Sequence, residues 1–230
     1  MPSLLPRSKK VRTALIVIAS IVVIAVVAGL LASTADSGHK KTRGTTKTAP
    51  PTTSALKLAV GVVKVQNTGT DTKLPSSIQG AVLQAAQTYV NDAVLAPLKS
   101  GHVDDGYEKI FGLSLRPAAS GPDRGALTEA TTGAARGAVS STASRVRIDG
   151  IGDPTGKIAL VATTFTLTVT ATTQAGPLVL HRNTALTFEN QFGSWVVTAY
   201  DVGVLRSGGA ATSAAHATRP GGTSGHGVAT

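Results

Sequence analysis

Three carboxylate side chains, Asp104, Asp105 and Glu108, cluster in a short stretch of the sequence. A pair of carboxylates can act as general acid and base when a pocket raises the pKa of one of them. The same residues at the start of a helix complement the helix dipole, and this simpler role is the one that we favour. The sequence has no serine-nucleophile, zinc-protease or phosphate-loop motif, and His102 and His181 lie far apart. We therefore expect a protein that is not an enzyme, with no cofactor and no metal site.

Arg182 is notable because it alternates with apolar residues in a predicted strand and so shares their face. The strand at residues 178–190 places an apolar set on one face: Leu178, Leu180, Leu186 and Phe188. Arg182 and Thr184 share that parity. We favour an exposed strand there, or a bulge that turns Arg182 outward. If Arg182 is instead buried, it needs a carboxylate partner, for which Asp201 and Glu189 are candidates. His181 is expected to face the other way, toward solvent.

The elements that would position these side chains begin with a strand at residues 56–66 and a helix that starts near Ser76. Ser76 and Gln79 have the spacing of a capping box. An apolar stripe at helical spacing follows: Ile78, Val82, Ala86, Tyr89, Val90, Ala93 and Val94. Pro97 and Gly101 predict the end of this helix. A short helix at residues 102–112 and a third helix at about 121–133 come next.

From Arg145 onward the apolar period changes to two, which predicts strands at about 145–149, 157–172, 178–190 and 195–205. Inward parity slips within two of them, so we expect one β-bulge near residues 162–164 and a parity shift between Val197 and Tyr200. A meander of three or four antiparallel strands after a set of helices indicates an α+β domain, with the helices on one face of a bent sheet.

Residues 14–32 form an uncharged, Val- and Ile-rich run about as long as a bilayer's hydrocarbon core is thick. Four basic residues precede it: Arg7, Lys9, Lys10 and Arg12. The positive-inside rule then predicts a single-pass protein of the cell membrane, with a cytoplasmic N-terminus and an extracytoplasmic remainder. Further basic residues on the other flank weaken this orientation. A signal peptide cleaved near residues 33–35 is the alternative, and either reading exports the remainder.

Composition divides the chain into five parts. We expect a basic head at residues 1–13, a transmembrane helix at 14–32, a disordered Thr/Pro/Lys stalk at 33–54, the α+β domain at 55–206, and a disordered Gly/Ala/Ser/Thr tail at 207–230. The net charge of +10 lies mainly beside the apolar run, which favours the lipid bilayer as partner and not a nucleic acid. Cysteine is absent, so there are no disulfides.

Two segments, YVNDAVLAPLKSGHVDDGYEKIFG and FENQFGSWVVTAYDV, resemble the opening helices and the last hairpin of the nuclear-transport-factor-two-like (SnoaL-like) superfamily. The resemblance covers about residues 75–205. A single N-terminal anchor before such a domain, in an Ala/Thr/Gly-rich chain, resembles the actinobacterial Mce-associated membrane proteins. It is also similar to the same-fold subunits of type IV secretion or conjugation machines.

This resemblance implies a cystatin-like cone with a cavity between sheet and helices. The candidates to line it are Tyr89, Arg182, Tyr200 and Trp195. Tyr89 is either a core aromatic residue, which we favour, or a cavity donor as in the isomerase members. The resemblance also implies a non-catalytic, membrane-tethered assembly module of an envelope complex, which binds other envelope proteins or itself as a homodimer. Binding of a small hydrophobic ligand, or isomerase- or cyclase-like activity, is the alternative, and DNA contact through the stalk is a third and weaker one.

Overall fold

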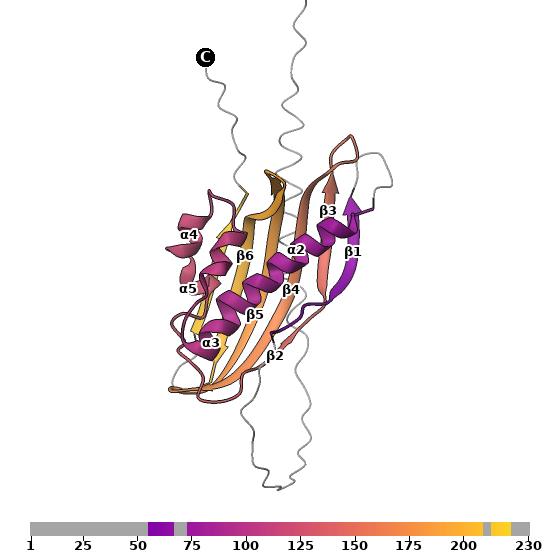
Figure 1. Ribbon diagram of the computed structural model, residues 1–230. Coiled ribbons are helices and arrows are strands. Elements are labelled where there is room, and N and C mark those ends of the chain that lie inside the picture. The colour runs from indigo at the N-terminus through magenta and orange to yellow at the C-terminus, as the bar shows by residue number, and fades with distance from the viewer. Residues whose placement is uncertain (1–54, 67–72, 209–212, 222–230) are drawn as a thin grey trace, which may run out of the picture. The chain divides into compact units, whose positions relative to one another are not determined.

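The computed structural model describes residues 55–66, 73–208 and 213–221, all within one folded unit. The expected basic head, membrane segment and stalk, including Arg7, Lys9, Lys10 and Arg12, lie outside the described residues. Among the residues that are described, no helix is both long enough and apolar enough to cross a membrane. The architecture is α+β: a large bent sheet carries a few helices on one face (Figure 1).

One helical run crosses the sheet, and its sequence stripe is its buried side. It consists of α2 (Ser76–Thr88), the π-helical segment η1 (Tyr89–Leu95) and α3 (Ala96–Ser100). Gly101 ends it with a left-handed backbone at φ 79°, as predicted. The predicted capping box is wrong: Pro75 is the N-cap residue, and the side chain of Gln79 donates to the carbonyl of Leu74.

The other helices are short. They are the 3₁₀ segment η2 (Asp105–Ile110), α4 (Arg116–Ser120) and α5 (Arg124–Leu127). The expected third helix up to residue 133 is therefore wrong. Thr128 is already extended, and the next backbone N–H, that of Glu129, bonds to the carbonyl of Ala93 in place of a helical partner.

Seven strands form one sheet in the order β1-β3-β4-β5-β6-β7, with β2 paired to β4 beside β3. Their bounds are β1 Val60–Gln66, β2 Ser140–Ala143, β3 Val146–Gly152, β4 Ile158–Thr173, β5 Gly176–Gln191, β6 Ser194–Ser207 and β7 Ser213–Arg219. All neighbours are antiparallel except β1 and β3, which are parallel. The meander that was predicted from Arg145 is thus the centre of a larger sheet.

Strand β7 corrects the expected domain boundary, because it forms inside the segment that we expected to be a disordered tail. It pairs with β6 in unbroken register from Tyr200 opposite Arg219 to Arg206 opposite Ser213. Its sequence, SAAHATR, has neither β-branched apolar residues nor aromatics, so composition gave no strand signal. The sheet therefore continues past residue 206.

The register shifts in three strand pairs of the described sheet, and two of these shifts bear on the predicted bulge and parity change. The register of β3 and β4 shifts where Gly152 pairs with Ile158 and Ile151 with Leu160, which leaves Ala159 unpaired. The bulge that we placed at residues 162–164 is therefore three to five positions earlier. The register of β5 and β6 shifts between Thr187 and Phe188 and leaves Thr198 extra, which confirms the predicted parity change in the last strand.

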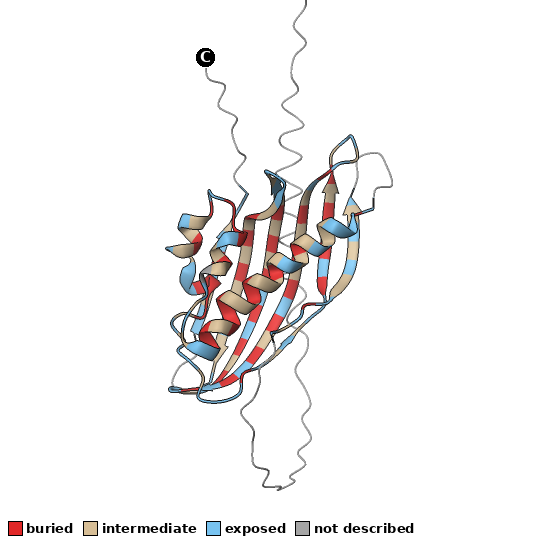
Figure 2. Cartoon of the chain, viewed as in Figure 1, coloured by how far each residue is buried: buried red, intermediate tan, exposed pale blue. Residues whose placement is uncertain are grey.

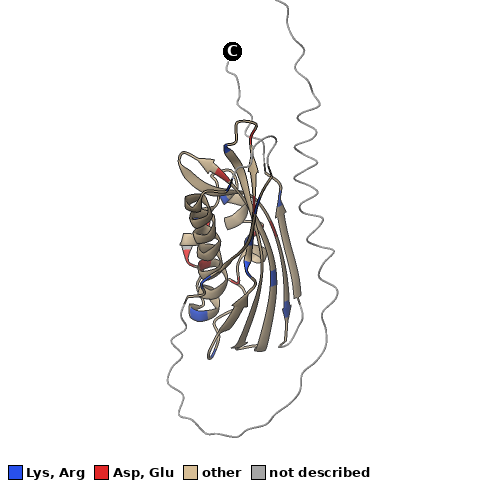
Figure 3. Cartoon of the chain, turned by 90° about the vertical axis from the view of Figure 1, so that its right-hand side faces the viewer, with Lys and Arg blue, Asp and Glu red and all other residues tan. Residues whose placement is uncertain are grey.

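The core lies between the helices and the concave face of the sheet (Figure 2). Its largest apolar members come from both layers: Tyr89, Leu95, Leu98, Tyr107, Phe111, Leu167, Leu180, Leu186 and Phe188. The ring of Phe111 packs edge-on against Tyr107 and Tyr200, with centroid distances of 6.3 and 5.5 Å. Seen from the side, the helices lie on one side of the sheet, and no described helix covers the other (Figure 3).

Candidate functional site

Arg182 is fully buried, with 1% of its surface exposed. The pairing of β4 and β5 is continuous from Leu160 to Thr173, so no bulge turns Arg182 outward. It points into the concave side of the sheet, so the two interpretations that we favoured, an exposed strand or a bulge, are wrong, and the buried alternative holds. The required carboxylate is Glu129, whose Oε1 accepts a hydrogen bond of 2.6 Å from Arg182 Nη2. Neither Asp201 nor Glu189 is the partner.

Four side chains make up what we call the inner arginine cluster: Tyr89, Glu129, Arg182 and Arg206. Arg206 from β6 binds the same carboxylate, through Nε at 2.7 Å from Oε2 and Nη2 at 2.9 Å from Oε1. The hydroxyl of Thr132 donates to Oε2 at 2.7 Å. One buried carboxylate is thus shared by two guanidinium groups, which compensates the cost of removing it from water.

Tyr89 is the member of the inner arginine cluster that comes from the helical layer, and it binds Arg182. Its hydroxyl donates to the carbonyl of Leu127 at 2.9 Å and accepts from Arg182 Nη1 at 2.7 Å. Burial raises the pKa of Tyr89, and the nearby charge of Arg182 opposes this only in part. The hydroxyl of Tyr89 donates its proton to the carbonyl of Leu127 and so cannot donate to a ligand. Tyr89 is therefore a core residue whose hydroxyl is hydrogen-bonded, as we favoured.

The break in regular helix at Pro97 helps to place Glu129. Proline has no N–H, so it cannot donate to the carbonyl of Ala93 one turn earlier. That carbonyl instead accepts the backbone N–H of Glu129 at 3.0 Å. Arg182 Nη1 also donates to the carbonyl of Ala126 at 2.8 Å. The segment that follows α5 is therefore fastened to both the helix and the sheet.

Tyr200 belongs to a second polar cluster, at the other end of α5. Its hydroxyl donates to Asp123 Oδ2 at 2.6 Å, and Arg219 Nε from β7 donates to the same oxygen at 2.7 Å. Burial and the bond to Asp123 raise the pKa of Tyr200. Burial alone would raise the pKa of Asp123, but the bonds from Arg219 and Tyr200 lower it. Residues 123–129 are thus tied to the sheet at both ends.

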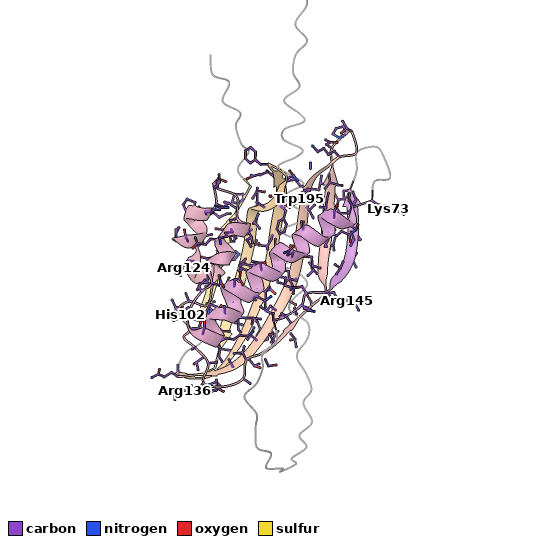
Figure 4. The ribbon with its side chains drawn as sticks, in the orientation of Figure 1. Lys73, His102, Arg124, Arg136, Arg145 and Trp195 are labelled. Atoms are coloured by element: carbon purple, nitrogen blue, oxygen red, sulfur yellow. The ribbon has the colours of Figure 1, made fainter. Side chains whose placement is uncertain are left out.

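The four predicted cavity candidates do not form one site. The structure brings Tyr89 and Arg182 together, places Tyr200 in the Asp123 cluster, and leaves Trp195 outside both. Trp195 is half-buried near the turn between β5 and β6, at the upper end of the sheet in Figure 4. Sequence reasoning missed Glu129 and Arg206. Arg206 had the parity of Val202 and Val204, but our strand ended one residue before it.

A few buried polar atoms on the concave side have no hydrogen-bond partner among the described residues. They are Arg182 Nε and the hydroxyls of Thr163, Thr184 and Thr198. Arg182 and Thr184 are adjacent on one face of β5, and Thr163 is on the neighbouring strand, diagonal to Thr184. Such atoms usually mark an ordered water or a bound group. They carry donors and a net positive charge, which is the chemistry that would suit a small anion.

The convex side of the sheet, which we call the outer face, is different in character. Most of its central positions carry short, uncharged side chains, Thr164, Thr166, Thr168, Asn183, Ala185 and Gly203, and the larger side chains among them are His181 and the exposed Leu205. Its charged side chains have partners: Arg147 binds Asp149 at 2.7 Å, and Asp201, which lies opposite Ala185, contacts His216. Lys and Arg occur on the sheet as isolated positions and not as a basic patch (Figure 3).

Comparison of the chain with protein-family models, with curated proteins and with solved structures found no match. The superfamily resemblance therefore remains a prediction. Within the described residues, no three His, Asp or Glu side chains are grouped so that they could hold a metal ion. Asp104 accepts from the N–H of Gly106 as the N-cap of η2, which is the helix-start role that we favoured for that residue.

Proposed function

We propose that the protein is a membrane-tethered, extracytoplasmic interaction module of an envelope complex, and that it has no catalytic role of its own. The outer face is the observation that carries this proposal. The three long strands β4, β5 and β6 have 16, 16 and 14 residues, so at a spacing of about 4.8 Å their outer side covers roughly 700 Å², close to what one partner buries in a standard interface. Short uncharged side chains on such a face lose little entropy and little hydration when they are covered.

The state of the concave side supports the same proposal. The polar groups that would serve an enzyme are bound to one another: the hydroxyl of Tyr89 to a carbonyl, and Glu129 to two arginines. A general acid or base must be able to reach a substrate proton. These groups instead fasten residues 123–129 to the sheet, so their work is structural.

The apolar run at residues 14–32 and its basic flank supply the tether in this proposal. Protease access to a C-terminal tag on intact cells tests the orientation of the chain. N-terminal sequencing of the mature chain distinguishes an uncleaved anchor from a cleaved signal peptide. We expect a protected N-terminus, an intact segment and an accessible tag. A protected tag would contradict the extracytoplasmic placement.

A pair of charge substitutions tests the outer face. Asn183→Lys and Thr166→Lys place cations in its centre, where the unsubstituted side chains are exposed. We expect loss of the native complex in mild detergent with an unchanged unfolding midpoint. Ser77→Lys, at an exposed position on α2, is the matched control and leaves the complex intact. If all three variants keep the complex, the outer face is not the interface.

A second candidate function follows from the unpartnered atoms beside Arg182. Arg182 Nε and the hydroxyl of Thr184, two residues further on the same face of β5, would suit the acidic end of a small hydrophobic ligand. A panel of short- and medium-chain carboxylic acids tests it by thermal shift, since a ligand at 100 times its Kd adds about 2.7 kcal/mol. A shift that is lost in Thr184→Val would favour this candidate over the interaction module. An unchanged midpoint across the panel would end it.

A further inference from the structure

The free edge of β7 is the least protected strand edge of the sheet. Strand β7 ends the sheet order, and only β6 pairs with it among the described strands. Exposed strand edges expose unpaired N–H and C=O groups and tend to add another strand unless a bulge, a lysine, a proline or short length prevents it. Strand β7 is seven residues long, regular in register, and contains neither lysine nor proline.

The other edges carry those protections. Strand β1 has a register irregularity between Val60 and Val63 and an exposed lysine, Lys64, in its middle. Strand β2 is only four residues long. The contrast within one sheet indicates that the β7 edge is left open to a partner strand.

The sequence of β7 is also compatible with antiparallel pairing to a second copy of itself. In an antiparallel pair centred on His216, each His216 lies opposite its copy, Ala215 opposite Ala217, and Ala214 opposite Thr218. Ser213 then lies opposite Arg219, whose charge Asp123 of the same chain already binds. His216 likewise contacts Asp201 of its own strand neighbour. Apart from His216 and its copy, every pair in this register includes a small side chain, and no unpaired like charges meet.

We propose that two copies of this chain associate through antiparallel pairing of their β7 edges, about a two-fold axis at His216. This inference rests on the proposed function: it names a second copy of the chain as one partner and adds the β7 edge to the outer face as a contact surface. Isologous pairing of this kind closes on itself, so it yields a dimer and not a fibre. It also joins two sheets into one, and the two outer faces become a single surface for further partners.

The contact is small, because a single seven-residue ladder covers less area than a standard interface. We therefore expect weak association in dilute solution. Two chains anchored in one membrane would meet at a much higher effective concentration, on the order of millimolar for a short tether. The pairing is thus suited to a tethered protein.

Cysteine scanning tests the register, because the chain has no cysteine of its own. Opposite residues of antiparallel strands have Cα atoms about 4.5–5.5 Å apart, within the range of a disulfide. In the 230-residue chain, in membranes under mild oxidation, His216→Cys should form dimers at least about tenfold faster than Thr166→Cys, an exposed outer-face control.

The flanking positions sharpen the test. In the proposed register, Ala214 lies about 14 Å from its own copy but opposite Thr218. Ala214→Cys and Thr218→Cys should therefore fail to crosslink singly and succeed as a double variant. His216→Lys, which places two like charges opposite each other at the axis, should weaken association by up to about fivefold in sedimentation of the solubilised chain.

The outcomes separate this inference from the proposed function. Crosslinking at Thr166→Cys as fast as at His216→Cys would overturn edge pairing in favour of contact between sheet faces. If no β7 position crosslinks while outer-face substitutions still break the native complex, the edge inference fails and the interaction module stands. If neither result appears, both fail.

Discussion

Replacing Arg182 with methionine should strongly destabilise the fold. The side chain is fully buried and binds Glu129 at 2.6 Å, Tyr89 at 2.7 Å and the carbonyl of Ala126 at 2.8 Å. Methionine keeps much of the volume but leaves these groups without their donor. Breaking a buried ion pair costs about 3–5 kcal/mol, and we expect the lower end because Arg206 still holds the carboxylate. That is a large part of a typical domain's stability of about 5–15 kcal/mol.

Arg147→Met is the matched control. Arg147 is also a strand arginine bound to a carboxylate, but half of its side chain is exposed, and such pairs contribute about 0–1 kcal/mol. Urea unfolding of both variants can be followed by the fluorescence of Trp195, the single tryptophan. Equal losses in the two variants would refute the structural role of the inner arginine cluster. A double variant, Arg182→Met with Glu129→Leu, should lose less than the sum of its single changes.

Three further results are expected. All three tyrosines are buried and have raised pKa values, that of Tyr107 to about 12 because of burial. Tyrosinate absorbance should therefore stay absent as the pH rises past the ordinary tyrosine pKa of about 10, and should develop together with unfolding. Ionisation of one ring near pH 10 in the folded protein would contradict this. The lowered pKa of Asp123 adds stability that is present above about pH 4 and is lost as the pH falls through the pKa of the folded state. In urea titrations, Asp123→Asn should therefore be less stable than the unsubstituted protein at pH 7 and should lose less stability below pH 4. The same loss of stability below pH 4 in both proteins would count against this role of Asp123. Phe192 in the β5–β6 turn is fully exposed and has a left-handed backbone with φ 53°, which strains a phenylalanine more than an asparagine. Phe192→Asn should therefore stabilise the fold by about 0.5–1 kcal/mol in thermal unfolding. A lower unfolding midpoint would show that the backbone is not strained there.

The regular elements were predictable because their buried faces have clear periods. The stripe from Val82 to Val94 and the alternation in β4 and β5 depend on local sequence, and so does the parity slip that leaves Thr198 extra. Strand β7 was not predictable, since a small residue such as Ala217 is buried only because another element covers it. A sequence window does not contain that element.

The inner arginine cluster was half predictable. The parity of Arg182 indicated that a buried arginine would need a carboxylate, and that requirement is met. The carboxylate could not be identified from the sequence, because Glu129 follows a short helix in a stretch with no period and is placed by long-range contacts, among them the backbone bond to Ala93. Contacts between residues more than fifty positions apart depend on the whole chain path.

Photo-crosslinking in intact cells tests the interaction module most directly. A photoreactive amino acid at Asn183, exposed on the outer face, is compared with the same group at Ser77, exposed on α2. The account predicts discrete adducts with a second copy or with other envelope proteins from Asn183 and none from Ser77. Adducts from Ser77 alone, with none from the outer face, would contradict it.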